Sequence, residues 1–228
     1  MVTKGISEGS LGMKYDLIIF DLDGTLLNTL DDLVGACNGA LREAGYPERS
    51  RDEVRRFIGN GVARLIRRAL PENAGDDVAE RVLARFKTIY MEHVNDKTKP
   101  YPGIPELLRE LRKKGIKIAV NSNKVDAATQ RLLYDHFPGL IDLGLGEQPD
   151  IPKKPAPDGA RQIMSALNVR PARTLYVGDG DADILTAQNA GIDCAWVSWG
   201  YRRREELKGL ELPRTFDTVE ELKACILG

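Results

Sequence analysis

The chain has 228 residues, of which 42% are hydrophobic and 29% are charged, and its formal net charge is −1. This composition is typical of a globular protein with one large domain, or with a core that carries a smaller inserted domain. A charge so close to zero provides no basic field to hold nucleic acid or an anionic membrane. We therefore expect a small ligand, and neither nucleic acid nor a membrane as partner.

The N-terminal stretch MVTKGISEGSLGMK lacks the apolar region of a signal peptide, and no apolar run reaches the ~18 residues of a membrane span. We interpret residues 1–13 as a leader or a cloning remnant and expect them to be mobile. The cysteines Cys37, Cys194 and Cys225 form no CxxC motif and no metal-binding spacing. A sparse, odd set is typical of a reducing compartment, so we predict a cytoplasmic location.

Along the chain, a buried strand is predicted first, over residues 15–20, from the short apolar run YDLIIF. No convincing strand follows until the TKPYPG stretch; instead, amphipathic patterns predict helices over residues 29–44, 51–57, 62–70 and 76–93. Beyond that stretch, strands are predicted over residues 117–120, 141–146, 174–178 and 194–198, with helical patterns between them. Such alternation predicts a parallel sheet covered by helices.

The predicted fold class is therefore α/β, with a Rossmann-like parallel sheet as core and an inserted all-α cap domain. We place the core at residues 14–27 and 99–228, and the helical cap at residues 28–98. The sequence leaves open whether the protein is a monomer or a homodimer.

Polar side chains follow several of the predicted strands, at the edge where open parallel sheets bind their ligands. They are Asp21 and Asp23 after the first strand, Ser122 and Asn123 after the next, Lys154 in the loop IPKKPAPDGA, and Asp179 and Asp183 in VGDGDADI. Taken singly, each has an ordinary explanation, such as an Asp-Gly turn, a helix cap or a solvated lysine. Their shared position at strand ends favours one functional site.

The chemistry of this set indicates phosphoryl transfer. No histidine belongs to it, which argues against a Ser-His-Asp triad or a histidine-bound zinc ion. Neighbouring carboxylates repel each other by roughly 4 kcal/mol per pair at ~4 Å and an effective dielectric constant of ~20, unless a hard cation such as Mg²⁺ lies among them. With Mg²⁺ and a lysine present, one aspartate can attack phosphorus, and a second can protonate the leaving oxygen and later activate water.

The order of these motifs resembles that of phosphatases of the haloacid dehalogenase superfamily, in the subclass with a helical cap after the first motif. The motifs are DLDGT, NSNK, KKPAPD and GDGDADI, and the resemblance extends over nearly the whole chain from Lys14. Within the superfamily, the stretches FIGNGVARLIRRAL, DKTKPYPGIPELL and VSWGYRRREEL resemble the phosphoglycolate phosphatase group.

The resemblance implies that Asp21 is the nucleophile and a metal ligand. It implies that Asp23 is the general acid and base, with its backbone carbonyl on Mg²⁺, and that Asp179 is a direct metal ligand whose surroundings Asp183 orients. Ser122 and Lys154 are expected to hold the phosphoryl oxygens, with the backbone N–H of Asn123 beside them. The chain departs from the family pattern at Gly180, Asp181 and Ala182, which leaves the hydrogen bonds around the metal open.

For the substrate, the resemblance implies a small phosphorylated metabolite, with 2-phosphoglycolate as the leading candidate. The cap loop over residues 58–65 is the candidate selectivity element, and Arg64 is a candidate partner for a substrate carboxylate, although a solvated arginine in a helix-helix turn is an equal alternative. Arg202, Arg203 and Arg204 are interpreted as a solvated charged face.

Other activities remain as alternatives. A pyrophosphatase, or a phosphatase for another small metabolite, would use the same core chemistry. A β-phosphoglucomutase-like enzyme is disfavoured because Leu33 stands near the position where those relatives carry a histidine, and a dehalogenase because Asp23 is present. A non-enzymatic phospho-acceptor of the response-regulator type is disfavoured because a cap that excludes water suits turnover.

Overall fold

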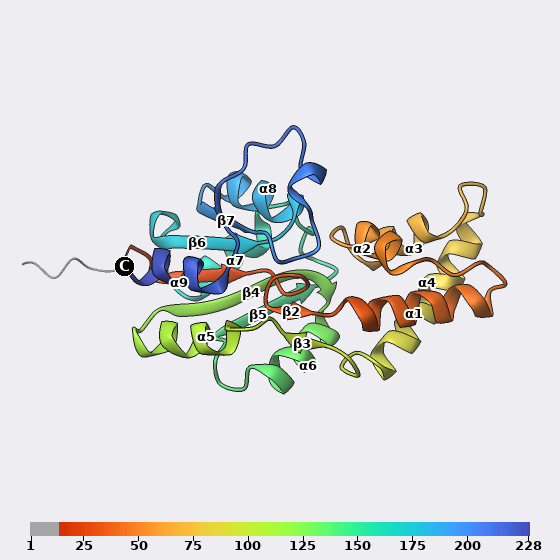
Figure 1. Cartoon of the computed structure of the whole chain (residues 1–228), viewed down its shortest axis with the longest axis horizontal. Helices are drawn as coiled ribbons and strands as arrows, with labels where there is room; N and C mark the ends of the chain where they lie inside the picture. Colours follow the sequence, from red (N-terminus) through yellow and green to blue (C-terminus); the bar gives the residue numbers. More distant parts are fainter. Residues whose placement is uncertain (1–13) are drawn as a thin grey trace, which may run out of the picture.

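The computed structural model describes residues 14–228, and the predicted leader or remnant at residues 1–13 lies outside the described residues. Six strands form one sheet: β1 (Leu17–Phe20), β4 (Lys117–Val125), β5 (Leu143–Glu147), β6 (Thr174–Gly178), β7 (Asp193–Val197) and β8 (Arg214–Phe216). Their order is β5-β4-β1-β6-β7-β8 and every pair of neighbours runs parallel. Strand β1 therefore lies inside the sheet, with β4 on one side and β6 on the other (Figure 1).

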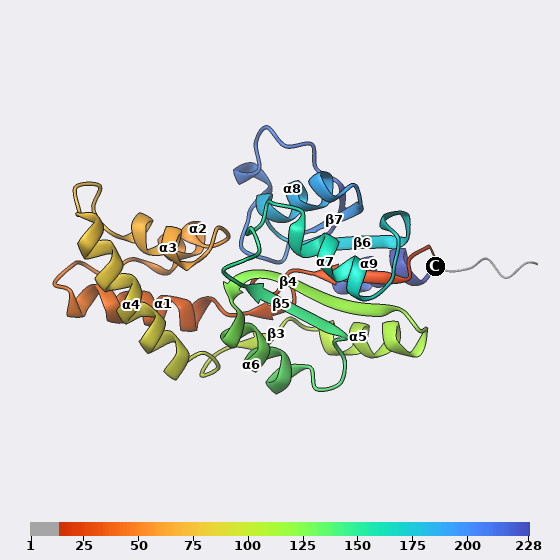
Figure 2. The same ribbon diagram turned by 180° about the vertical axis from the view of Figure 1, so that it is seen from behind.

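Helices cover both faces of this sheet, because the side chains of each strand alternate between the faces. On β1, Leu17 and Ile19 pack in the cluster that includes α7 (Asp158–Ala166) and α8 (Asp181–Ala190). Ile18 and Phe20 point the other way, into the cluster formed with α5 (Ile104–Lys113), α6 (Asp126–His136) and α9 (Val219–Leu227). Figure 2 shows the resulting three layers from behind. The predicted α/β class with a Rossmann-like parallel sheet is confirmed.

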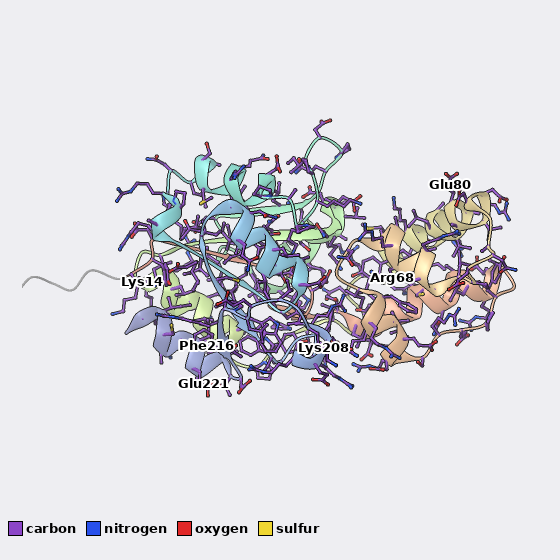
Figure 3. The ribbon with its side chains drawn as sticks, turned by 90° about the horizontal axis from the view of Figure 1, so that it is seen from above. Lys14, Arg68, Glu80, Lys208, Phe216 and Glu221 are labelled. Atoms are coloured by element: carbon purple, nitrogen blue, oxygen red, sulfur yellow. The ribbon has the colours of Figure 1, made fainter. Side chains whose placement is uncertain are left out.

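A second, all-helical unit lies beyond one end of the sheet. It consists of α1 (Leu30–Glu43), α2 (Arg51–Phe57), α3 (Val62–Ala69) and α4 (Asp76–Glu92). In Figure 3 the labelled Glu80 lies at its outer part and Arg68 lies closer to the core. The predicted helical insertion is thus confirmed.

A short antiparallel pair marks the place where the chain leaves and re-enters the core. Strand β2 (Leu27–Asn28) precedes the four helices in the chain, β3 (Lys99–Pro100) follows them, and the two strands pair with each other. This pairing brings residues 28 and 99 together, and it supports our proposal that residues 28–98 form a cap domain and residues 14–27 and 99–228 the core.

The structure differs from the predicted elements in several places, and the short strands β2 and β3 are among those that are not predicted. Strand β4 continues through Val125, whereas the sequence predicts its end at Val120. Its pairing with β5 shifts register between Asn121 and Val125, so this part of the strand is irregular and still hydrogen-bonded. Strand β8 and helix α9, near the C-terminal end, are not predicted from the sequence. Over residues 14–228, none of the helices combines the length and the apolar character that crossing a membrane requires.

Candidate active site

Asp21 lies directly after β1, the strand that runs between β4 and β6. Its backbone N–H donates to Val177 O of β6 at 2.9 Å, so the strand pairing fixes the position of this residue. One carboxylate oxygen accepts a hydrogen bond from the N–H of Leu22 at 2.7 Å. The side chain is thereby aimed away from the sheet, at the edge where parallel α/β sheets bind ligands.

Asp23 lies in the turn that follows, and its carboxylate is held by two groups. Thr29 Oγ1 donates to its Oδ1 at 2.6 Å, and Lys124 Nζ lies 2.9 Å from Oδ1 and 3.0 Å from Oδ2. Because Thr29 directly precedes α1 of the helical unit and Lys124 belongs to β4, Asp23 connects the two parts of the molecule.

Lys154 places a buried ammonium group against Asp21. Its Nζ lies 2.8 Å from Asp21 Oδ1 and 2.7 Å from Asp183 Oδ1. Burial disfavours the charged form, but the carboxylates of Asp183 and Asp21 raise the pKa of Lys154 well above its ordinary value. Lys154 is therefore a cation at neutral pH.

The side chain of Asn123 positions this lysine by pairing with its backbone. Lys154 N donates to Asn123 Oδ1 at 2.9 Å, and Asn123 Nδ2 donates to Lys154 O at 3.1 Å. The sequence predicts a role for Asn123 through its backbone N–H, and the structure adds this role of the side chain.

Three buried carboxylates meet beside Lys154. Asp21, Asp179 and Asp183 each offer an oxygen within 4.8 Å of the other two. Burial and the charge of Asp183 raise the pKa of Asp21 well above its ordinary value, and the same two causes raise the pKa of Asp179 to about 7. Lys154 pairs with Asp21 and Asp183 but not with Asp179, and the surplus negative charge is costly at this depth.

This donor set fits a hard divalent cation. Carboxylate oxygens are the ligands that such cations prefer, and an ion among them would offset the burial and the repulsion that together raise both pKa values. Gly24 allows the close approach of Asp179, because with φ at +90° a Cβ there would lie 2.5 Å from Asp179 Oδ2. Thr25 Oγ1 and the backbone N–H of Tyr201 donate to the same carboxylate at 3.2 and 2.6 Å and fix its orientation.

Asp183 is already occupied by protein partners. Its Oδ1 faces Lys154, and its Oδ2 accepts a hydrogen bond from the N–H of Gly180 at 3.0 Å. The role of Asp183 in orienting the metal site stays a prediction. Three residues depart from the family motif. The N–H of Gly180 donates the hydrogen bond to Asp183, and the side chain of Ala182 is buried. The carboxylate of Asp181 pairs with Arg202 at 3.3 Å.

Ser122 and Lys124 lie in the irregular part of β4 and line the same cavity as Asp21 and Asp23. Lys124 is a site residue that the sequence analysis did not single out. Its side chain is 2% exposed, and its Nζ lies 4.7 Å from the centre of the Tyr90 ring. Although burial opposes the charge, Asp23 raises the pKa of Lys124 above its ordinary value, so it remains charged.

The cap closes this cavity with apolar groups. The cavity lies between the core residues Asp21, Asp23, Ser122, Asn123, Lys124 and Lys154 and the cap residues Leu33, Ile58, Gly59, Gly61, Val62 and Leu65. The predicted selectivity loop therefore contributes to the cavity. Arg64 itself is exposed on α3 and is not one of the lining residues. Its role in substrate binding stays a prediction.

Arg202 corrects the interpretation of the arginine run as a solvated face. Arg203 and Arg204 are exposed, but the Arg202 side chain is 12% exposed. Its Nη2 donates to Ile58 O at 2.6 Å and its Nη1 to Arg56 O at 3.3 Å. Arg202 therefore joins the core to the cap loop, with Asp181 as its partner in the core.

The family model of haloacid dehalogenase-like hydrolases matches residues 18–197. The chain belongs to this family. The matched region contains all the residues that line the cavity and the three clustered carboxylates.

Individual relatives agree with this assignment. The phosphoglycolate phosphatase of Aquifex aeolicus is 35% identical over 206 residues, which cover 90% of this chain and 95% of the relative. That of Pseudomonas putida is 34% identical and covers 99% of this chain and 84% of the relative. A crystal structure from Lactobacillus delbrueckii subsp. bulgaricus, assigned as a phosphoglycolate phosphatase, is 37% identical. It superposes with a TM-score of 0.90 and covers 95% of this chain and 100% of the other. The predictions of the superfamily and of an enzyme of the phosphatase class are confirmed.

Proposed function

We propose that the protein is a Mg²⁺-dependent phosphatase that hydrolyses a small phosphomonoester, with 2-phosphoglycolate as substrate and glycolate as product. The observation that carries the proposal is the meeting of Asp21, Asp23, Ser122 and Lys154 at one cavity under the cap. The relatives named phosphoglycolate phosphatase support the choice of substrate. A cytoplasmic location is part of the same proposal.

In the first half-reaction, a carboxylate oxygen of Asp21 attacks phosphorus, and the bond between phosphorus and the ester oxygen breaks. Asp23 gives its proton to the departing oxygen, so glycolate leaves as an alcohol. The phosphoryl group stays on Asp21 as an aspartyl-phosphate. Lys154 and Ser122 bind its non-bridging oxygens and stabilise the charge that develops on them.

In the second half-reaction, Asp23 takes a proton from a water molecule whose oxygen attacks phosphorus. The bond between phosphorus and Asp21 breaks, which regenerates the carboxylate and releases inorganic phosphate. The apolar cap residues keep bulk water from the cavity during this cycle.

A magnesium ion held by Asp21, Asp179 and the backbone carbonyl of Asp23, with Asp183 orienting the site, would supply the positive charge that lets a phosphate dianion approach these carboxylates. The three-carboxylate cluster and its raised pKa values support this part of the proposal.

The test is phosphate release in Mg²⁺ from 2-phosphoglycolate, pyrophosphate, glucose 1-phosphate and p-nitrophenyl phosphate, with Asp21→Asn as control. We expect the highest kcat/KM for 2-phosphoglycolate, and no release with the variant or with excess chelator. A maximum on pyrophosphate, or a flat and slow profile, would discard the substrate and keep the chemistry. No release from any compound would favour a phospho-acceptor without turnover.

A further inference from the structure

Lys124 is a cation placed where the leaving group must lie. Its Nζ is 2.9 and 3.0 Å from the two carboxylate oxygens of Asp23. Under the proposed function, Asp23 gives its proton to the ester oxygen and so lies beside the departing alcohol. The ammonium group next to Asp23 therefore faces the alcohol half of the substrate, whereas Lys154, against Asp21, faces the phosphoryl half.

The other groups around this half of the cavity do not suit a negative charge. The cap contributes Leu33, Ile58, Val62 and Leu65 together with two glycines. A carboxylate buried against such side chains needs a partner of opposite charge. Among the described residues that line this cavity, the cations are Lys124 and Lys154, whereas Arg202 lines the adjoining cavity beside Asp179.

The ammonium group of Lys124 lines the cavity and contacts Asp23 and Tyr90. A lysine ammonium carries three N–H donors. Nζ lies 2.9 and 3.0 Å from the two carboxylate oxygens of Asp23 and 4.7 Å from the centre of the Tyr90 ring. A ligand carboxylate in the cavity would therefore share this ammonium group with Asp23.

The short distance between the ester oxygen and the carboxylate of a phosphorylated α-hydroxy acid suits the position of Lys124 beside Asp23. Its carboxylate carbon follows the ester oxygen by two bonds of about 1.5 Å each. When Asp23 contacts the ester oxygen, the substrate carboxylate comes close to the same ammonium group. Without that cation, the substrate carboxylate and Asp23 would repel each other.

We propose that Lys124 binds the carboxylate of the leaving group and thereby selects phosphorylated α-hydroxy acids over neutral phosphoesters. This inference rests on the proposed function and replaces Arg64 by Lys124 as the residue that recognises the acid. Lys124 lies in β4, which is anchored in the sheet, so the selectivity comes from the core and not only from the cap.

The test compares 2-phosphoglycolate with ethyl phosphate, which has the same chain length and no carboxylate. We expect Lys124→Met to lower kcat/KM for 2-phosphoglycolate by about 50-fold relative to its effect on ethyl phosphate, because a charged hydrogen bond is lost. Lys124→Arg, which keeps the charge, should retain most of the preference. Lys114→Met makes the same substitution at an exposed position and should change neither substrate.

Each other outcome has a definite meaning. Equal losses on both substrates would show that Lys124 only positions Asp23, and would overturn the inference. Loss of the preference in Arg64→Met but not in Lys124→Met would assign the carboxylate to Arg64. If Lys124→Met does not fold, the neutral Lys124→Gln variant takes its place in the comparison. A wild-type enzyme without preference for 2-phosphoglycolate would refute the proposed substrate itself, and this result is visible before any variant is made.

Discussion

Lys154 Nζ lies 2.8 Å from Oδ1 of Asp21, and both side chains are almost completely buried. The lysine thus stabilises the charge of Asp21, and in the proposed mechanism it also binds the phosphoryl oxygens. It also contacts Asp183, so its removal leaves two buried carboxylates without their cation.

We therefore expect Lys154→Met to lower the free energy of unfolding by about 3–5 kcal/mol in the absence of metal, since one partner of a buried ion pair is removed. Added Mg²⁺ should restore part of this loss. Lys153→Met is the matched control, because its side chain is 38% exposed and its ion pair with Glu147 should contribute about 1 kcal/mol or less. Chemical denaturation of both variants with and without Mg²⁺ measures the difference. Equal stability of the two variants would show that Lys154 does not compensate the carboxylates.

Substitutions of Asp21 and of Asp23 should have different effects on metal binding. Under the proposed mechanism, Asp23→Asn removes the general acid and base and should lower kcat by about 100-fold or more. The Asp23 side chain faces Lys124 and Thr29 and is not part of the carboxylate cluster, so metal affinity should remain. Calorimetric titration with Mg²⁺ checks this; loss of binding in the variant would assign the side chain of Asp23 to the metal.

The pKa of Asp179 predicts a pH dependence of stability. Burial and the charge of Asp183 raise this pKa from 3.8 to about 7. Between these values the folded protein retains a proton that the unfolded chain releases, so the metal-free protein loses stability as the pH rises, by at most about 4 kcal/mol from this group. In chelator, Asp179→Asn should therefore become progressively more stable than the wild type from pH 4 to pH 7.

Mg²⁺ should reverse this order, since the ion binds the ionised carboxylate in the wild type and has lost a ligand in the variant. Thermal unfolding of both proteins across this pH range, with and without Mg²⁺, shows which of the two is more stable under each condition. Parallel curves in chelator would contradict the raised pKa of Asp179.

The contacts of Arg202 predict that it holds the cap loop against the core. It donates to the carbonyl groups of Ile58 and Arg56 and pairs with Asp181. Loss of these hydrogen bonds in Arg202→Met should lower kcat/KM by about 10-fold and speed hydrogen exchange in the loop over residues 58–61. Lys208→Met, at an exposed position of the same core region, is the control (Figure 3). Unchanged exchange in Arg202→Met would show that the cap loop is held by other contacts.

The sequence predicts the parts of this molecule that follow a repeating pattern. The apolar run before Asp21 predicts β1, and parallel strands must end at one edge, so the meeting of Asp21, Lys154 and Asp179 follows from the order of elements. The four cap helices are predicted for the same reason, because each carries a clear helical period.

What the sequence does not predict depends on contacts between distant segments. Lys124 follows Ser122 and Asn123 in a motif that is typical of a turn, and its pairing with Asp23 becomes visible only when β4 is seen to continue. Its place in an otherwise buried stretch was the available signal, since a buried lysine needs a partner. Arg202 was grouped with two exposed neighbours because charge patterning alone cannot tell which of the three is mostly buried against the cap. Strand β8 has three residues, too few to show a period.

The most direct measurement for the central claim is chemical trapping of the phosphorylated enzyme. The enzyme is mixed with 2-phosphoglycolate carrying a ³²P label in Mg²⁺ and quenched with acid within one turnover, and the labelled peptide is identified. The account predicts one acyl-phosphate on Asp21 that hydroxylamine removes, with no label in Asp21→Asn. Phosphate release at full rate without any labelled enzyme, or a label on another residue, would contradict it.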